Sequence, residues 1–142
     1  MMEEMILKPI GRIETPFQTP GDLRVPPYHP QSPYRNPNVK GTVHIFEEFR
    51  EGIAGIQPGS RALLIFHFNQ SKGYRLTTSS PRFEGEVGVF STRSPHRPNY
   101  IGVTVVRFLE VDGCRLTFRG VDMLNGTPLL DIKPYSDETV PI

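Results

Sequence analysis

Hydrophobic and polar residues alternate along several short stretches of this chain, and this period of two is typical of strands that are half-buried in a sheet. The clearest stretch runs from Gly41 to Phe46, where apolar Val43 and Ile45 alternate with polar residues. Arg61 to Phe68 is almost continuously apolar in its middle, which predicts a strand buried on both faces. Further strands are predicted over Ile6–Thr15, Gly85–Phe90 and Leu129–Lys133.

Two more β-rich runs flank the dipeptide Asp112-Gly113. Val103 to Val111 precedes it and Cys114 to Val121 follows it. Asp-Gly is favoured in type I′ turns because both central residues of that turn need positive φ. We therefore expect a β-hairpin with a type I′ turn at this dipeptide.

One short helix is predicted from Glu47 to Ile56. Phe49, Ile53 and Ile56 recur there at the spacing of one helical face, and Pro58-Gly59 follows as a turn.

Residues 16–37 contain seven prolines, which predicts a long loop because proline cannot donate a backbone hydrogen bond to a sheet. A loop of this length in a compact domain commonly serves a site. Tyr28, His29, Tyr34 and Arg35 are interleaved with the prolines and favour a lid or an interface segment.

The element pattern predicts an all-β fold: a small closed or nearly closed β-barrel with one short helix and a long proline-rich loop. The 15 prolines and 13 glycines among 142 residues argue against long helices. The length fits one domain, so residues 1–142 are expected to form a single barrel domain.

Several function classes lack their motifs in this sequence. There is no G-x-G-x-x-G, no P-loop and no G-x-S-x-G, and one cysteine with four scattered histidines gives no zinc spacing. We therefore expect no metal. No apolar run approaches the ~18 residues of a membrane span, and the acidic N-terminus is unlike a signal peptide, so we expect a cytoplasmic protein without a membrane segment.

The segment Phe90–Gly102, here called the arginine loop, concentrates polar chemistry between two strands. Arg93 and Arg97 carry planar donor forks suited to carboxylate or phosphate, and two prolines stiffen the loop. Two interpretations of this loop stay open. Either it is a preorganised site for an anion or a nucleotide, or it is a surface loop whose arginines are solvated. The formal net charge is only +1, but basic residues gather before and within this loop: Lys72, Arg75, Arg82, Arg93 and Arg97.

A second candidate segment runs from Val121 to Tyr135. Asp131 and Lys133 lie two residues apart and should share one face of a strand, while Tyr135 could stack on a base. The alternative is a surface ion pair, which contributes little to stability, beside a tyrosine at a strand end.

These two segments together closely resemble the family of S-adenosylmethionine-dependent tRNA N6-adenosine methyltransferases that have a TsaA-like β-barrel. The resemblance rests on Thr92-Arg93-Ser94-Pro95-His96-Arg97-Pro98-Asn99 with Ile101-Gly102, on Gly126-Thr127-Pro128, on Asp131-Ile132-Lys133-Pro134-Tyr135, and on the opening Ile10-Gly11-Arg12-Ile13-Glu14-Thr15-Pro16-Phe17. It covers nearly the whole chain. One departure is Tyr100, which stands where the family usually has proline.

The resemblance implies a barrel that binds S-adenosylmethionine and a homodimer with the cofactor site near its interface. The implied substrate is the N6-threonylcarbamoyl adenosine beside the tRNA anticodon. The implied cofactor contacts are Pro33, Gln70, Ser71, Arg93, Val103, Gly120, Val121 and Asp122.

Roles follow from the chemistry of methyl transfer, which needs donor and acceptor aligned and a group that takes the N6 proton. Asp131 and His96 are rival proton acceptors, with a backbone carbonyl as a third choice. The expected RNA contacts are Arg97, Asn99, Lys133 and Tyr135. Two other functions stay open: methylation of another RNA or a small molecule, and a non-catalytic module that binds the cofactor.

Overall fold

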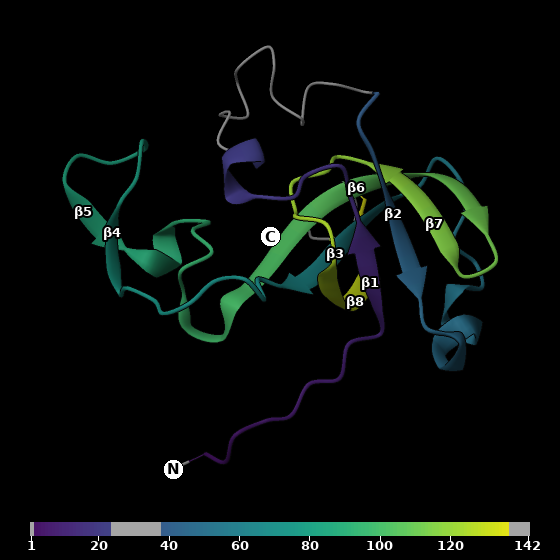
Figure 1. Ribbon diagram of the computed structural model, residues 1–142, viewed down its shortest axis with the longest axis horizontal. Coiled ribbons are helices and arrows are strands. Elements are labelled where there is room, and N and C mark those ends of the chain that lie inside the picture. Colours follow the sequence, from purple (N-terminus) through teal and green to yellow (C-terminus); the bar gives the residue numbers. More distant parts are fainter. Residues whose placement is uncertain (1, 24–37, 137–142) are drawn as a thin grey trace.

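Six antiparallel strands close into a barrel in the computed structural model, which describes residues 2–23 and 38–136 (Figure 1). The order around the barrel is β1-β2-β7-β6-β3-β8. The bounds are β1 Gly11–Glu14, β2 Lys40–Ile45, β3 Arg61–His67, β6 Ile101–Asp112, β7 Arg115–Arg119 and β8 Thr127–Pro134. The closed barrel confirms the fold class that the alternating pattern predicts.

The core lies inside the barrel and is built from alternate residues of the strands. In β3, Ala62, Leu64 and Phe66 point inward and are buried, whereas Leu63 and Ile65 on the other side are partly exposed. The prediction that this strand is buried on both faces is therefore wrong. A closed barrel encloses only one side of each strand, and nothing in the described chain covers the outer side of β3 completely.

The predicted hairpin is confirmed, but its turn differs from the predicted one. Asp112 pairs with Arg115, so the two turn residues are Gly113 and Cys114. Only Gly113 has positive φ, at 59°. A glycine at the first turn position with an ordinary residue after it is typical of a type II′ turn rather than type I′.

The predicted helix is the 3₁₀ helix η3, Glu47–Ile53, which packs at one end of the barrel. Ile53 is buried, and Phe49 and Ile56 pack against the core, as their spacing indicates. Among the residues that the structure describes, shorter 3₁₀ turns are η1 Pro20–Leu23, η4 Val89–Ser91 and η5 Pro98–Tyr100.

Two strand predictions need correction. The first strand begins at Gly11, because residues 2–7 are exposed and extend away from the barrel (Figure 1). The prediction for Gly85–Phe90 yields only β5, Glu86–Gly88, which pairs with the unpredicted β4, Thr77–Ser79, outside the barrel. We call residues 72–91, which include both strands, the ribbon. The proline-rich loop contains η1, and its residues 24–37 lie outside the described residues.

Among the described residues, no helix is long and apolar enough to cross a membrane. The same residues contain no group of three or more His, Cys, Asp or Glu side chains arranged to hold a metal ion.

Candidate functional site

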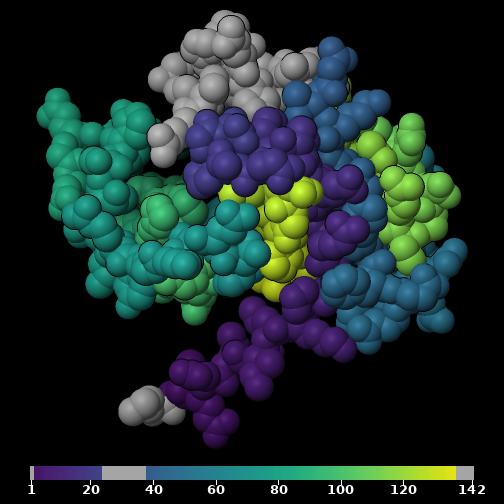
Figure 2. Space-filling view, in the orientation of Figure 1, coloured from purple at the N-terminus to yellow at the C-terminus, as the bar shows by residue number. Residues whose placement is uncertain are grey.

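A cavity of about 520 Å³ opens where β3 ends and β6 begins, and we call it the loop cavity. Its size falls within the ~300–1,000 Å³ of small-molecule sites. Residues 69–71, which follow β3, form one wall, and the arginine loop forms another. Residues 122–124 and the turn η1 complete it, and η1 lies over the β8 region with the ribbon to one side (Figure 2).

Five of the eight cofactor residues that the resemblance implies line this cavity: Gln70, Ser71, Arg93, Val103 and Asp122. His96, a predicted proton acceptor, and Arg97, an expected RNA contact, line it too. They come from three segments far apart in the sequence, and the antiparallel pairing of β3 with β6 brings the first two together.

Arg93 reaches across the cavity wall to β6. Its Nη2 donates a hydrogen bond to the backbone oxygen of Val103, and the side chain is otherwise exposed. This bond fixes the guanidinium beside the cavity and leaves the rest of its donor fork available to an anion.

Asp122 also lines the cavity, and the hydroxyl of Thr104 donates to its Oδ2. Thr104 is only 4% exposed and points into the barrel from β6. A carboxylate held in this way is suited to accept hydrogen bonds from an amine or from ribose hydroxyls.

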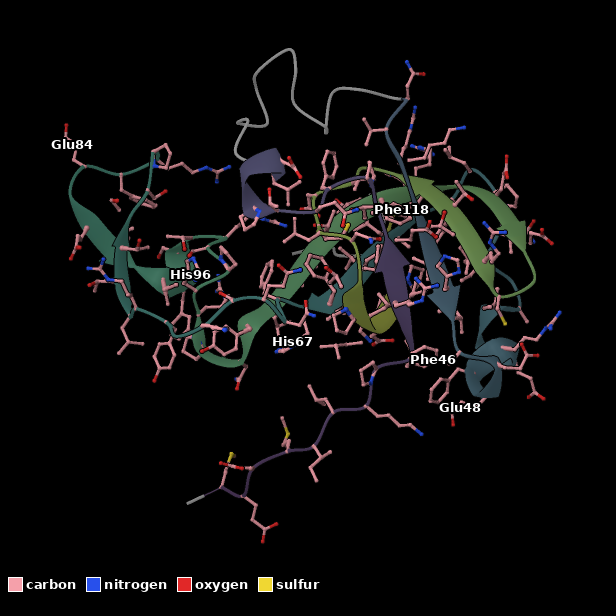
Figure 3. All side chains as sticks on the ribbon, in the orientation of Figure 1. Phe46, Glu48, His67, Glu84, His96 and Phe118 are labelled. Carbon is pink, nitrogen blue, oxygen red and sulfur yellow. The ribbon has the colours of Figure 1, made fainter. Side chains whose placement is uncertain are left out.

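His96 lies between the ribbon and the barrel (Figure 3) and is positioned by Ser71. The Ser71 Oγ lies 2.8 Å from His96 Nδ1 and 3.2 Å from the backbone oxygen of Pro95. The carbonyl can only accept, so both contacts are satisfied when Ser71 donates to Pro95 and His96 Nδ1–H donates to Ser71. Nε2 then carries the lone pair and can take a proton.

Arg97 holds the arginine loop in shape. Its Nη1 donates to the backbone oxygens of Thr92, at 2.9 Å, and Ser94, at 3.2 Å. Asn99 and Tyr100 follow with positive φ, 66° and 53°, and the chain turns there into β6. Proline has φ near −65°, so the backbone conformation of Tyr100 is one that the family's usual proline cannot adopt.

Three implied cofactor residues do not line the loop cavity. Val121 is fully buried in the barrel core. Gly120 has φ of 99° and packs against the backbone of Val105. Pro33 lies outside the described residues. Asn99, an expected RNA contact, is exposed at the rim but does not line the cavity.

Asp131, Lys133 and Tyr135 lie towards the other end of the barrel. Asp131 lines a second cavity, of about 1,040 Å³, between η3 and the barrel, and its Oδ2 lies 3.5 Å from Lys133 Nζ. The guanidinium of Arg61 lies 5.2 Å from the centre of the Tyr135 ring. Of the two side chains predicted to accept the proton, the structure brings only His96 to the loop cavity.

Sequence reasoning missed the apolar part of the loop cavity. Phe66 and Phe68, whose rings meet edge to face at 5.3 Å, form part of its lining, and Leu23 of η1 lies at its rim. In the alternating pattern of β6, Thr104 is a polar residue at an inward-facing position. This was the one sequence signal that could have identified Thr104 as a site residue.

Gly102 allows the two phenylalanine rings to lie against β6. A Cβ at this position would lie 2.5 Å from the Phe66 ring and 2.7 Å from the Phe68 ring. We therefore expect Gly102→Ala to displace these rings, to lower stability by ~1–3 kcal/mol and to reduce binding in the loop cavity. Thermal unfolding and ligand titration measure both effects. Gly52→Ala is the control, since a Cβ there meets nothing within 4 Å, and equal effects of the two variants would contradict the packing argument.

Asp22 holds η1 at the rim of the cavity. The backbone N–H groups of Thr19, at 3.1 Å, and Gln18, at 2.9 Å, donate to its Oδ2 and lower the pKa of the carboxyl below its ordinary value. A lowered folded-state pKa means that this contact supports the fold at neutral pH and is lost as the pH falls through the lowered value.

A carboxyl NMR titration should therefore give Asp22 a midpoint below the ordinary pKa of an aspartate. Asp22→Ala should release η1 and weaken binding in the loop cavity at neutral pH, whereas Asp22→Asn, which keeps an acceptor oxygen, should weaken it less. A midpoint at or above the ordinary value would contradict the capping role.

Comparison with known proteins places this geometry in context. The sequence profile of the tRNA-methyltransferase O N-terminal domain matches residues 12–139. A probable S-adenosyl-L-methionine-binding protein of Pyrococcus abyssi is 44% identical over 92% of this chain and 68% of its own length. An S-adenosyl-L-methionine-binding protein of Archaeoglobus fulgidus is 38% identical over 94% of this chain and 91% of its own length.

Longer proteins also match. A tRNA (adenine(37)-N6)-methyltransferase of Mus musculus is 37% identical over 92% of this chain, which spans only 31% of the mouse protein. The crystal structure of TrmO from Pseudomonas aeruginosa superposes with a TM-score of 0.75 and 33% identity, covering 97% of this chain and 60% of that one.

Proposed function

The chain belongs to the tRNA-methyltransferase O N-terminal domain family, and from this we propose that it is an S-adenosylmethionine-dependent methyltransferase acting on an adenosine N6 in tRNA. The proposed acceptor is the threonylcarbamoyl adenosine next to the anticodon. The family match agrees with the resemblance seen in the sequence and with the adenine-N6 methyltransferase names of the mammalian relatives.

One observation carries the proposal: the loop cavity brings a fixed guanidinium, a fixed carboxylate and an oriented imidazole to one place. Arg93 and Asp122 match the two polar ends of S-adenosylmethionine, its carboxylate and its adenosine. Phe66 and Phe68 supply the apolar surface between them. The residues present therefore fit the cofactor.

S-adenosylmethionine supplies a methyl group carried on a sulfonium sulfur. Arg93 would hold the cofactor's carboxylate, and Asp122 would accept from its adenine amine or ribose. The arginine loop, kept in shape by Arg97, fixes these groups before the RNA binds. Such alignment of donor and acceptor can contribute ~7–11 kcal/mol to lowering the barrier.

His96 accepts the N6 proton in this proposal. An exocyclic amine is a weak nucleophile because its lone pair is delocalised, so removing its proton assists attack. Ser71 holds Nδ1 as the donor, which leaves Nε2 as the base. Asp131 lies in the second cavity and is the less suitable of the two candidates. The RNA contacts at Arg97, Asn99, Lys133 and Tyr135 stay predictions.

We further propose that the protein is a homodimer in the cytoplasm with its cofactor site near the interface. Ile101, Val103 and Val105 form an apolar row on the outer side of β6 and are 36%, 39% and 43% exposed. The first two also line the loop cavity. A second copy that covers this row would therefore lie beside the cofactor.

The direct test is methyl transfer to tRNA, followed by mass spectrometry of the nucleosides. Incubation with S-adenosylmethionine and tRNA that carries the threonylcarbamoyl adenosine should add one methyl group to that nucleoside. Methylation of a different nucleoside or of a small molecule would show another acceptor. Cofactor binding without transfer to any tRNA pool would indicate a non-catalytic module.

A further inference from the structure

The ribbon, residues 72–91, lies in the chain between residues 69–71 and the part of the arginine loop that lines the loop cavity, residues 92–97. Residues 69–71 lead into it, and the arginine loop leads out of it. Its two strands pair only with each other, and it stands away from the barrel (Figure 1). A molecule that reaches into the cavity from the ribbon side must therefore pass along it.

The ribbon exposes large apolar and aromatic side chains. Tyr74 is 54% exposed, Leu76 61%, Phe83 47% and Phe90 76%. A two-stranded ribbon has too little interior to bury them, and scattered exposed apolar residues need no explanation, but a group of them on one projecting element marks an interaction surface.

Positive charge is interleaved with these rings. Arg75 pairs with Glu86, with Nη2 3.3 Å from Oε1, and this pair is neutral overall. Lys72 and Arg82 form no ion pair with another described residue. Arg82 directly precedes Phe83 in the segment between β4 and β5, so a cationic and an aromatic residue are adjacent in the sequence there.

We propose that the ribbon binds the single-stranded RNA that flanks the adenosine to be methylated, with its aromatic rings stacking on unpaired bases and Lys72 and Arg82 contacting phosphates. This inference rests on the proposed function. Exposed rings beside unpaired cations are the surface that single-stranded nucleic acid needs, since stacking tolerates any base and the charge follows the backbone. A purely apolar protein partner would leave the two cations without a role.

The test uses neighbouring residues of opposite charge. Arg82→Gln should weaken tRNA binding and reduce the slope of log affinity against log salt by roughly 0.7–0.9, the value for one lost phosphate contact. Glu84→Gln, two residues away, should strengthen binding, because it removes a negative charge from the same surface. Phe83→Ala should weaken binding roughly five- to a hundredfold with the salt slope unchanged. Fluorescence anisotropy titrations at several salt concentrations measure all three.

S-adenosylhomocysteine binding by each variant serves as the folding control and should equal that of the unaltered protein. Affinities and salt slopes that stay unchanged in all three variants, while the unaltered protein binds and methylates tRNA, would overturn the ribbon proposal alone. A change in oligomeric mass for Phe83→Ala with unchanged RNA affinity would also overturn it, in favour of a protein interface. An unaltered protein that binds the cofactor but no tRNA would overturn the proposed function itself.

Discussion

Replacing Arg93 with alanine is expected to weaken S-adenosylmethionine binding by roughly ten- to a hundredfold. A hydrogen bond to a charged group contributes ~1.5–3 kcal/mol, and every ~1.4 kcal/mol is a factor of ten in affinity. The Arg93 side chain also bonds to the Val103 backbone, so the substitution removes one tie between the arginine loop and β6. Isothermal titration calorimetry gives the dissociation constant.

Two variants sharpen this test. Arg93→Lys keeps the charge but loses the planar fork, and we expect an intermediate affinity. Arg119→Ala removes an exposed arginine of β7 that does not line the loop cavity, and this variant should bind the cofactor normally. Undiminished affinity of Arg93→Ala would remove this residue from the site.

Replacing His96 with glutamine should lower the rate of methyl transfer by about 10²–10⁴-fold, the usual contribution of a positioned general base. Glutamine keeps a similar size but cannot take the proton. Cofactor affinity should change little, because His96 acts on the acceptor. Single-turnover measurement of methyl transfer to tRNA with the enzyme saturated in cofactor isolates this step.

The matched control is His44→Gln. This histidine lies on β2, its Nε2 contacts Glu14 at 2.6 Å, and it lines neither cavity, so its loss should leave the rate unchanged. Asp131→Asn tests the rival proton acceptor. A rate lost in Asp131→Asn and retained in His96→Gln would reverse the assignment made here.

The alternation of apolar and polar residues was sufficient to predict the barrel, because a closed sheet buries one side of every strand. It failed where that rule has a local exception. The outer side of β3 carries Leu63 and Ile65, and an apolar residue on an outer face looks the same in sequence as one in a core. The strand β4 escaped prediction because its three residues are Thr, Thr and Ser.

Sequence reasoning likewise predicted only part of the candidate site. Ser71, Arg93 and Asp122 lie in loops, and the pairing of β3 with β6 brings the first two together. The rest of the second candidate segment is different, because most of it lies along the strand β8. Thr127 lines the loop cavity, but at ~3.3 Å per residue Lys133 is about 20 Å further along, so one segment reaches two ends of the barrel. Sequence proximity could not reveal this.

A crystal structure with S-adenosylhomocysteine is the most direct test of the central claim, that the loop cavity is the cofactor site. The account predicts one ligand per chain in that cavity, with its carboxylate at Arg93 and its adenosine at Asp122. A ligand bound instead in the larger cavity beside η3, or an arginine loop that makes no contact with it, would contradict the account.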